Sequence, residues 1–124
     1  MMANMYAMFI DDERFPTEKR VKIQKKPEGQ VRLVPMIIAR SSKEAIVHLE
    51  VDGCPEFISF DHDLGGEDTA MSVVRYLIDR DLDADGNFIP HNFTYYVHSQ
   101  NCVGARNITG LLEGYFDYKK GLKK

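Results

Sequence analysis

Short apolar stretches alternate with amphipathic stretches along most of this chain. The apolar stretches are four to six residues long, too short for a helix. Runs that are apolar on both faces, or rich in aromatic and β-branched residues, are typical of strands buried within a sheet. The strands that we expect are Met5–Ile10, Met36–Ala39 (with a start as early as Val31), Phe57–Phe60 and Phe93–Val97.

The amphipathic stretches between these strands have the spacing of helices that pack on a sheet. The first follows Ser41 or Ser42 and the second follows Asp68 or Thr69, and each of these side chains can cap a helix N-terminus. We expect helices over residues 42–51, 70–79 and 102–112. Strands that alternate with helices predict an α/β fold with a parallel sheet and right-handed crossovers.

Residues 17–35 have a different pattern. Val21–Gln24 and Gln30–Leu33 alternate between apolar and polar residues, and the segment between them is rich in turn-forming residues. This pattern predicts a small hairpin inserted into the fold. Its basic residues fit either a solvated edge, where lysines discourage aggregation, or a lid that attracts phosphate. They are Lys19, Arg20, Lys22, Lys25 and Lys26.

The C-terminal third contains two segments that are harder to interpret. The acidic segment Asp81–Gly86 resembles the start of a calcium loop, but Asn92 stands where a closing glutamate is required, which favours a polar loop. Gly114–Tyr118 fits a last short strand or a packed extension. Lys119–Lys124 is basic, and we expect it to fray.

Composition indicates one soluble domain. The chain has 124 residues, 44% hydrophobic and 28% charged, which suffices for one core. We assign residues 1–124 to a single domain with its core at about 5–112 and a C-terminal extension at 113–124. The net charge of −3 predicts no binding to bulk DNA. Cys54 and Cys102 lack metal-site spacing, and the N-terminal apolar run is too short to enter a membrane, so we predict a cytoplasmic protein with reduced cysteines.

Chemically capable side chains follow three of the four predicted strands. The carboxyl ends of parallel strands meet at one edge of the sheet, which is where ligands bind in open α/β folds. A solvated turn with helix-capping acids is the simpler explanation for any one strand end, but not for three. The side chains are Asp11, Asp12 and Arg14 after the first strand, Asp61, His62 and Asp63 after the third, and His98, Ser99 and Asn101 after the fourth.

Carboxylates from two strands form a site of hard oxygen ligands. Like charges placed together cost energy unless a cation or a proton relieves them. Oxygen ligands of this kind suit Mg²⁺, and Mn²⁺ is the alternative. The predicted ligands are Asp11, Asp12, Asp61 and Asp63.

These motifs resemble the phospho-receiver domains of response regulators. The resemblance is closest to the receiver-like domains proposed to process cyclic phosphates, and it covers about residues 5–112. It implies a flavodoxin-like, receiver-type three-layer sandwich with a parallel central sheet, and it places Asp61 at the position of the phospho-acceptor. The motifs that carry it are Asp11–Arg14, Phe60–Gly66, and His98–Asn101 with Gly104 and Asn107–Ile108.

The chain also departs from an ordinary receiver. No lysine followed by proline closes a fifth strand after residue 100, so the fold is shortened at its C-terminal end. Ordinary receivers also lack the two histidines, His62 and His98. These departures favour phosphate-ester chemistry over a phosphorelay switch.

Three functions remain open on the sequence alone. In the first, a bound cation neutralises a phosphoryl group, Asp61, His62 and His98 are catalytic, and the substrate is a cyclic phosphate at an RNA end or a cyclic nucleotide. In the second, the chain is a signalling or phosphate-binding module with Asp61 as phospho-acceptor. In the third, it is an interaction protein that has lost its chemistry. The residues that we expect to bind substrate are Arg14, Ser99, Asn101 and Asn107.

Overall fold

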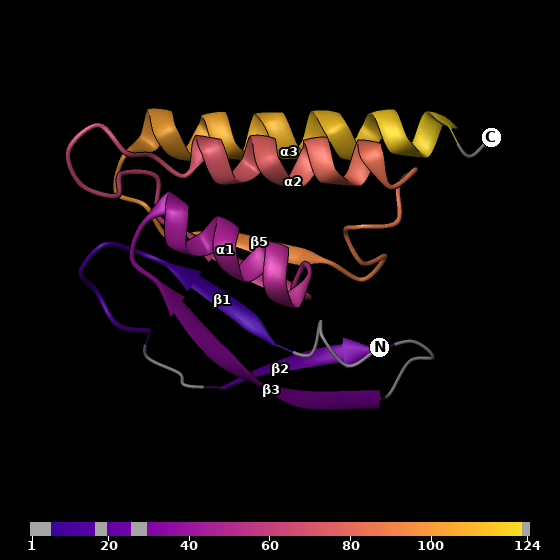
Figure 1. The fold of residues 1–124 in the computed structure, drawn as a ribbon, viewed down its shortest axis with the longest axis horizontal. Helices are drawn as coiled ribbons and strands as arrows, with labels where there is room; N and C mark the ends of the chain where they lie inside the picture. Colours follow the sequence, from indigo (N-terminus) through magenta and orange to yellow (C-terminus); the bar gives the residue numbers. More distant parts are fainter. Residues whose placement is uncertain (1–5, 17–19, 26–29, 123–124) are drawn as a thin grey trace.

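Four parallel strands form the centre of this protein (Figure 1). The computed structural model describes residues 6–16, 20–25 and 30–122, with side chains for 6–16 and 33–122. The strand order is β2-β3-β1-β4-β5. The elements are β1 (Ala7–Ile10), β2 (Arg20–Lys25), β3 (Gln30–Ala39), α1 (Ser42–Asp52), β4 (Phe57–Phe60), α2 (Met71–Asp83), β5 (Thr94–Val97) and α3 (Cys102–Leu122).

The strand pairing confirms the predicted receiver-type α/β fold. Strands β3, β1, β4 and β5 pair in parallel, and they correspond to the four apolar stretches of the sequence. Strand β2 pairs antiparallel with β3, as the alternating pattern predicted. Met5, the first residue of the first predicted strand, lies outside the described residues.

The hairpin projects from the end of the sheet opposite to the predicted site. Residues 30–35 of β3 pair with β2, whereas residues 36–39 pair with β1. The hairpin therefore extends past the amino ends of the parallel strands, and Figure 1 shows it at the end away from the arrowhead of β1. The strand residues of the hairpin therefore lie far from the predicted site, which argues against their acting as a lid over it. Its turn, residues 26–29, lies outside the described residues.

All three helices cover one face of the sheet (Figure 1), so the predicted three-layer arrangement is reduced to two layers in the described chain. The crossovers from β3 to β4 and from β4 to β5 step in the same direction across the sheet. Right-handed crossovers that step in one direction place their helices on one face. The segment between β1 and β3 contains a strand, β2, where a second layer would need a helix.

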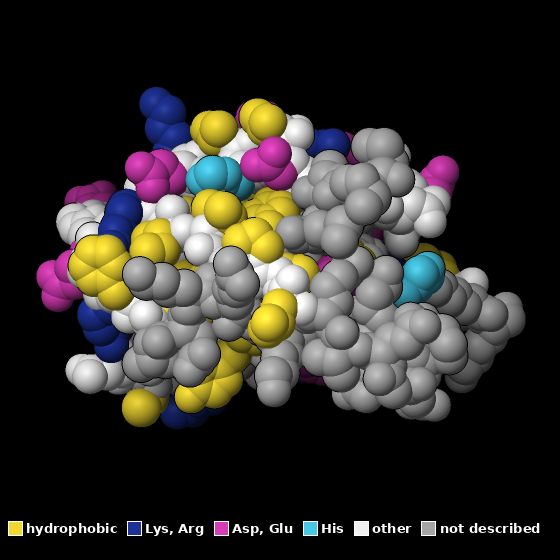
Figure 2. Space-filling model, turned by 90° about the horizontal axis from the view of Figure 1, so that it is seen from below, with side chains coloured by type: hydrophobic (Ala, Val, Ile, Leu, Met, Phe, Trp, Pro, Cys, Tyr) yellow, Lys and Arg dark blue, Asp and Glu magenta, His cyan; other side chains and the backbone are white. Residues whose placement is uncertain are grey.

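The main core lies between the sheet and this helical layer. Met8, Ile10, Ile58 and Phe60 of the central strands are fully buried in it. A smaller cluster around Ala7 and Val34 lies on the other face. Figure 2 looks onto that face, where hydrophobic side chains are visible at the surface. The helical layer therefore supplies most of the burial that holds the strands in register.

The first two helices begin next to each other at the carboxyl edge of the sheet. Ser41 caps α1, because its side chain accepts the backbone N–H of Glu44, and this confirms one of the two predicted caps. Asp68 does not cap α2. The other predicted cap, Thr69, accepts the backbone N–H of Met71 through its hydroxyl at 3.3 Å, although Ala70 occupies the N-cap position itself. The carboxylate of Asp68 instead accepts the backbone N–H and the hydroxyl of Ser42, at 2.9 and 2.6 Å. Asp68 thus ties the loop after β4 to the start of α1.

Helix α3 is longer than predicted. Of the two alternatives for Gly114–Tyr118, the short strand is wrong, because the helix runs without a break to Leu122 and packs through Tyr115. Its buried residues continue at helical spacing, and they are Gly104, Ile108, Leu112 and Tyr115. None of the helices in the described chain is long and apolar enough to cross a membrane. Cys54 and Cys102 are both free thiols.

Asp81 fastens the C-terminal half of α3, and this explains why the expected fraying at Lys119 does not occur. Its buried carboxylate accepts the backbone N–H groups of Phe88 and Ile89, the hydroxyl of Tyr115, and an ion pair from Lys119 Nζ at 2.8 Å. Both carboxylate oxygens are thereby bonded within the protein. The segment Asp81–Gly86 is the end of α2 and its turn, not a calcium loop.

We predict that Asp81→Asn lowers the free energy of unfolding by roughly 3 kcal/mol, because it leaves Lys119 without its buried partner. Asp83→Asn, an exposed change in the same turn of α2, is the matched control and should have little effect. Urea denaturation of both variants measures the difference. An effect of Asp81→Asn no larger than that of the control would contradict the structural role.

The difference in unfolding free energy between wild type and Asp81→Asn should depend on pH. Burial alone would raise the pKa of Asp81, but hydrogen bonds from Ile89, Lys119 and Tyr115 outweigh burial and lower it. The stabilisation by the carboxylate is therefore fully present above the unfolded pKa, about 3.9, and is lost as the pH falls through the folded value. The difference between wild type and Asp81→Asn should shrink below about pH 4.

Candidate functional site

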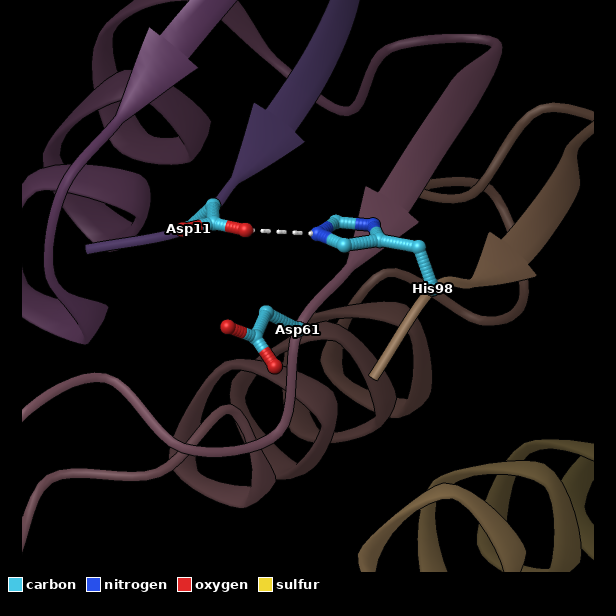
Figure 3. A group of neighbouring side chains, drawn as sticks. All are labelled: Asp11, Asp61 and His98. Atoms are coloured by element: carbon cyan, nitrogen blue, oxygen red, sulfur yellow. Dashed lines mark hydrogen bonds and ion pairs between the residues drawn. The ribbon is translucent and has the colours of Figure 1, made fainter. Parts of the chain in front are cut away.

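Three parallel strands end side by side and bring Asp11, Asp61 and His98 together (Figure 3). Each residue directly follows its strand, and the last residues of the strands, Ile10, Phe60 and Val97, are in register. Ligand atoms of the three side chains all lie within 4.8 Å of one another. We call Asp11, Asp61 and His98 the acidic cluster. It confirms the predicted meeting of strand ends at one edge of the sheet.

Asp11 is buried, and its carboxylate has several hydrogen-bond partners. Oδ1 accepts the backbone N–H groups of Glu13 and Arg14, at 3.0 and 2.8 Å. Oδ2 lies 3.0 Å from Nε2 of His98 and 2.9 Å from Nε of Arg14. Burial alone would raise the pKa of Asp11, but these hydrogen bonds and the charge of Arg14 lower it. Asp11 is therefore ionised at neutral pH.

Arg14 joins the two carboxylates of the acidic cluster. Its Nε contacts Asp11, and its Nη2 lies 3.2 Å from Oδ2 of Asp61. The guanidinium relieves the repulsion between two acids that are both almost completely buried. Nearly half of the Arg14 side chain (45%) remains exposed. An arginine in this position can also offer a planar pair of donors to a phosphate group.

Arg40 fixes the loop that carries Arg14, a role that the sequence analysis missed. Nη1 of Arg40 donates to the carbonyl oxygens of Asp11 and Arg14, at 3.0 and 2.5 Å. The backbone N–H of Arg40 donates to Glu44 in the first turn of α1. The available signal was positional, since Arg40 directly follows β3 in the way that Asp11 follows β1.

His98 has both ring nitrogens engaged. Nε2 contacts Asp11, and Nδ1 lies 2.7 Å from the hydroxyl of Ser59. The ring stacks on Phe9 with a centroid distance of 4.6 Å. Phe9 and Ser59 are directly paired on β1 and β4. Two neighbouring residues of the sheet therefore hold the imidazole, Phe9 against its face and Ser59 at Nδ1. Ser59 was not predicted, although it is the single polar residue of its strand.

A second group of side chains lies between the loop after β4 and the start of α3. The Oδ1 of Asn101 accepts the backbone N–H of Gly104, and its Nδ2 donates to Asp63. The other oxygen of Asp63 lies 3.0 Å from Nδ1 of His62. The hydrogen bonds from His62 and Asn101 lower the pKa of Asp63. We call His62, Asp63, Asn101 and Gly104 the helix-start cluster.

Gly104 leaves room for the ring of His62. A Cβ atom built at Gly104 would lie 2.3 Å from Cγ of His62, so no other residue fits there without moving the histidine. Only 12% of the His62 side chain is exposed. Nδ1 is oriented by Asp63, whereas Nε2 has no hydrogen-bond partner among the side chains and backbone that the structure describes. His62 therefore combines a fixed ring with one available nitrogen.

The remaining predicted site residues lie at the margins. Asp12 is exposed, and its carboxylate lies beside Gly65 instead of in the acidic cluster. The hydroxyl of Ser99 accepts the backbone N–H of Asn101, and Asn107 is exposed on α3. Of the predicted metal ligands, only Asp11 and Asp61 lie together, and His98 is the third member of their group. The roles of Asp12, Asp63, Ser99 and Asn107 stay predictions.

The acidic cluster fits a divalent cation. Two carboxylates and a neutral imidazole carry a charge of −2, which such an ion balances, and their ligand atoms converge without a rearrangement of the strands. In the structure, the guanidinium of Arg14 supplies the positive charge between Asp11 and Asp61. A mixture of oxygen and nitrogen ligands does not by itself select one metal.

A family model described as the cyclic-phosphate processing receiver domain matches residues 6–114. This chain belongs to that family. The match runs from β1 into α3 and includes every residue of the acidic cluster and the helix-start cluster. No curated protein and no solved structure matches the chain. This membership confirms the resemblance that the three sequence motifs indicated.

We predict that Gly104→Ala displaces the ring of His62 from the helix-start cluster, because the new methyl group would overlap it. The ring resonances of His62 in an NMR spectrum should shift, while those of His98 stay in place. Gly110→Ala is the matched control on the same helix, where an added Cβ meets nothing within 4 Å. The control should gain roughly 1 kcal/mol of helix stability. Unchanged His62 resonances in Gly104→Ala would contradict this packing.

Proposed function

We propose that this domain uses a divalent cation to open a cyclic phosphate ester. The observation that supports this most directly is the convergence of Asp11, Asp61 and His98 within 4.8 Å, with Arg14 beside them. Membership of a family associated with cyclic-phosphate processing supplies the substrate class. Mg²⁺ and Mn²⁺ are the ions that we propose, with Asp11, Asp61 and His98 as ligands and with Asp12 and Asp63, the other two ligands predicted from the sequence, as further candidates.

The cation and Arg14 would share the negative charge of the phosphoryl group. A bound divalent ion polarises phosphoryl oxygens and stabilises the charge that develops on them. If a cation balanced the charges of Asp11 and Asp61, the guanidinium of Arg14 would be free to leave its bridge between them. It would then offer a pair of N–H donors to the phosphate oxygens. Ser99, Asn101 and Asn107 lie on the α3 side, where we propose that they contact the rest of the substrate.

We propose different roles for the two histidines. Both ring nitrogens of His98 are in hydrogen-bond contact, with Asp11 and with Ser59, which suits a residue that positions the cluster or binds the metal. His62 is held by Asp63 through Nδ1 and leaves Nε2 available. A carboxylate that orients an imidazole in this way is the usual arrangement of a general acid or base. His62 is therefore our candidate for proton transfer.

The proposed reaction is a hydrolysis. The oxygen of a water molecule bonds to phosphorus, and one of the two ester P–O bonds of the ring breaks. The proton lost by the water and the proton gained by the leaving alkoxide balance, so the product is a phosphomonoester with a free hydroxyl. His62 would carry one of these transfers, which typically contributes a factor of about 10² to 10⁴ in rate.

The alternative function is a receiver-type signalling or phosphate-binding module with Asp61 as phospho-acceptor. The buried position of Asp61 at the end of β4, next to Asp11, favours it. The two functions make different demands on the side chains. Acyl-phosphate formation needs Asp61 but neither histidine, whereas hydrolysis of a cyclic ester needs a proton-transfer group.

The test is the turnover of a 2′,3′-cyclic nucleotide with Mg²⁺ or Mn²⁺. We expect Asp61→Asn to weaken metal binding and abolish turnover. His62→Gln should lower kcat by about 10² or more while metal affinity stays the same. His91→Gln, an exposed histidine in the loop before β5, is the matched control. Metal binding without turnover, together with acyl phosphate on Asp61 from a small phosphodonor, would overturn the enzyme in favour of the module.

A further inference from the structure

Phe15 is an exposed aromatic residue in the loop that carries Arg14. It directly follows Arg14, and 74% of its surface is accessible. The ring gains little of the stability that burial gives most phenylalanines. Its Cα lies about 3.8 Å from that of Arg14, so a ligand held by Arg14 would bind beside the segment that carries Phe15.

The ring of Phe15 is backed on one side by Arg40. The guanidinium carbon of Arg40 lies 4.7 Å from the ring centroid, in the geometry of a cation–π contact. The same guanidinium is fastened to the carbonyl oxygens of Asp11 and Arg14. The arginine that fixes the Asp11–Arg14 loop therefore also supports Phe15. With Arg40 on one face and most of the ring accessible, the other face is open to a ligand.

We infer that Phe15, backed by Arg40, is a stacking platform for the nucleobase of the substrate. This inference rests on the proposed function and narrows it, since it selects a cyclic phosphate that carries a base over cyclic phosphates of simple polyols. Aromatic rings bind bases through their π-faces with little preference for sequence. Arg14 would hold the phosphate, and Phe15, the next residue in the same loop, would hold the base.

A cyclic nucleotide and the cyclic end of an RNA share this chemistry. The net charge of −3 provides no strong attraction for a long polyanion. A platform of a single ring also recognises one base. We therefore expect the terminal nucleotide to supply most of the binding energy in both ligands, and the experiment compares the two.

The first experiment uses the absence of tryptophan from the chain. Phe15→Trp introduces a single fluorophore at the platform, and Tyr118→Trp introduces one at an exposed position near the far end of α3. Both are prepared with His62→Gln, so that the ligand is consumed at least about 10²-fold more slowly during the titration. With Mn²⁺ or Mg²⁺, adenosine 2′,3′-cyclic phosphate should quench Phe15→Trp and leave Tyr118→Trp unchanged. Glycerol 1,2-cyclic phosphate, which has no base, should quench neither.

The second experiment measures turnover with the native His62. Phe15→Ala and Phe15→Leu should both raise KM for the cyclic nucleotide by roughly tenfold, because leucine keeps an apolar contact but cannot stack. KM for glycerol 1,2-cyclic phosphate should not change. A short RNA that ends in a 2′,3′-cyclic phosphate should show the same dependence on Phe15, and much tighter binding than the mononucleotide would assign the site to RNA ends.

The outcomes separate this inference from the proposed function. Quenching at Phe15→Trp without turnover of any cyclic phosphate would support base stacking on Phe15 and contradict the proposed enzymatic function. Turnover that is equally efficient with and without a base, in wild type and in Phe15→Ala, would support the enzyme and overturn the platform. No quenching by the nucleotide, or equal quenching at both tryptophan positions, would also overturn it.

Discussion

The bridge from Arg14 to Asp11 and Asp61 is the interaction on which the site depends. Parallel pairing puts two carboxylates and an imidazole at adjacent strand ends, where they would repel one another or remain unsatisfied without a cation. Arg14 relieves that repulsion, and Arg40 holds the loop that presents it. In the function that we propose, a metal ion would take over this charge balance and Arg14 would turn to the phosphate. The stability of the site and the proposed binding of a ligand would thus use the same charges.

Two separate supports hold the two histidines, which is consistent with the different roles that we propose for them. The sheet supports His98 through Phe9 and Ser59, whereas α3 supports His62 through Gly104 and through Asn101, which holds Asp63. The packing of α3 therefore controls one histidine without touching the acidic cluster. Asp81 contributes at a distance, because its contacts with Tyr115 and Lys119 fasten the far half of the same helix.

The parts of this structure that could be predicted from the sequence are those fixed by local pattern and parallel pairing. Four apolar stretches followed by polar residues were enough to place Asp11, Asp61 and His98 at one edge. Other features depend on contacts between distant residues. The glycines at 110 and 114 argued against a continuous helix, but burial of Leu112 and Tyr115 and the ion pair of Lys119 outweigh them. The contacts of Ser59 and Arg40 exist only once three strands have assembled.

The most direct test of the account is anomalous diffraction from a crystal soaked in Mn²⁺. A manganese peak should lie within bonding distance of Asp11, Asp61 and Nε2 of His98, and the guanidinium of Arg14 should have moved out of its bridge between the carboxylates. A peak coordinated by Asp12 or Asp63 without Asp11 and Asp61 would contradict the account. So would Arg14 still bridging the two acids with no manganese between them, because the acidic cluster would then be an ion-pair network and not a metal site.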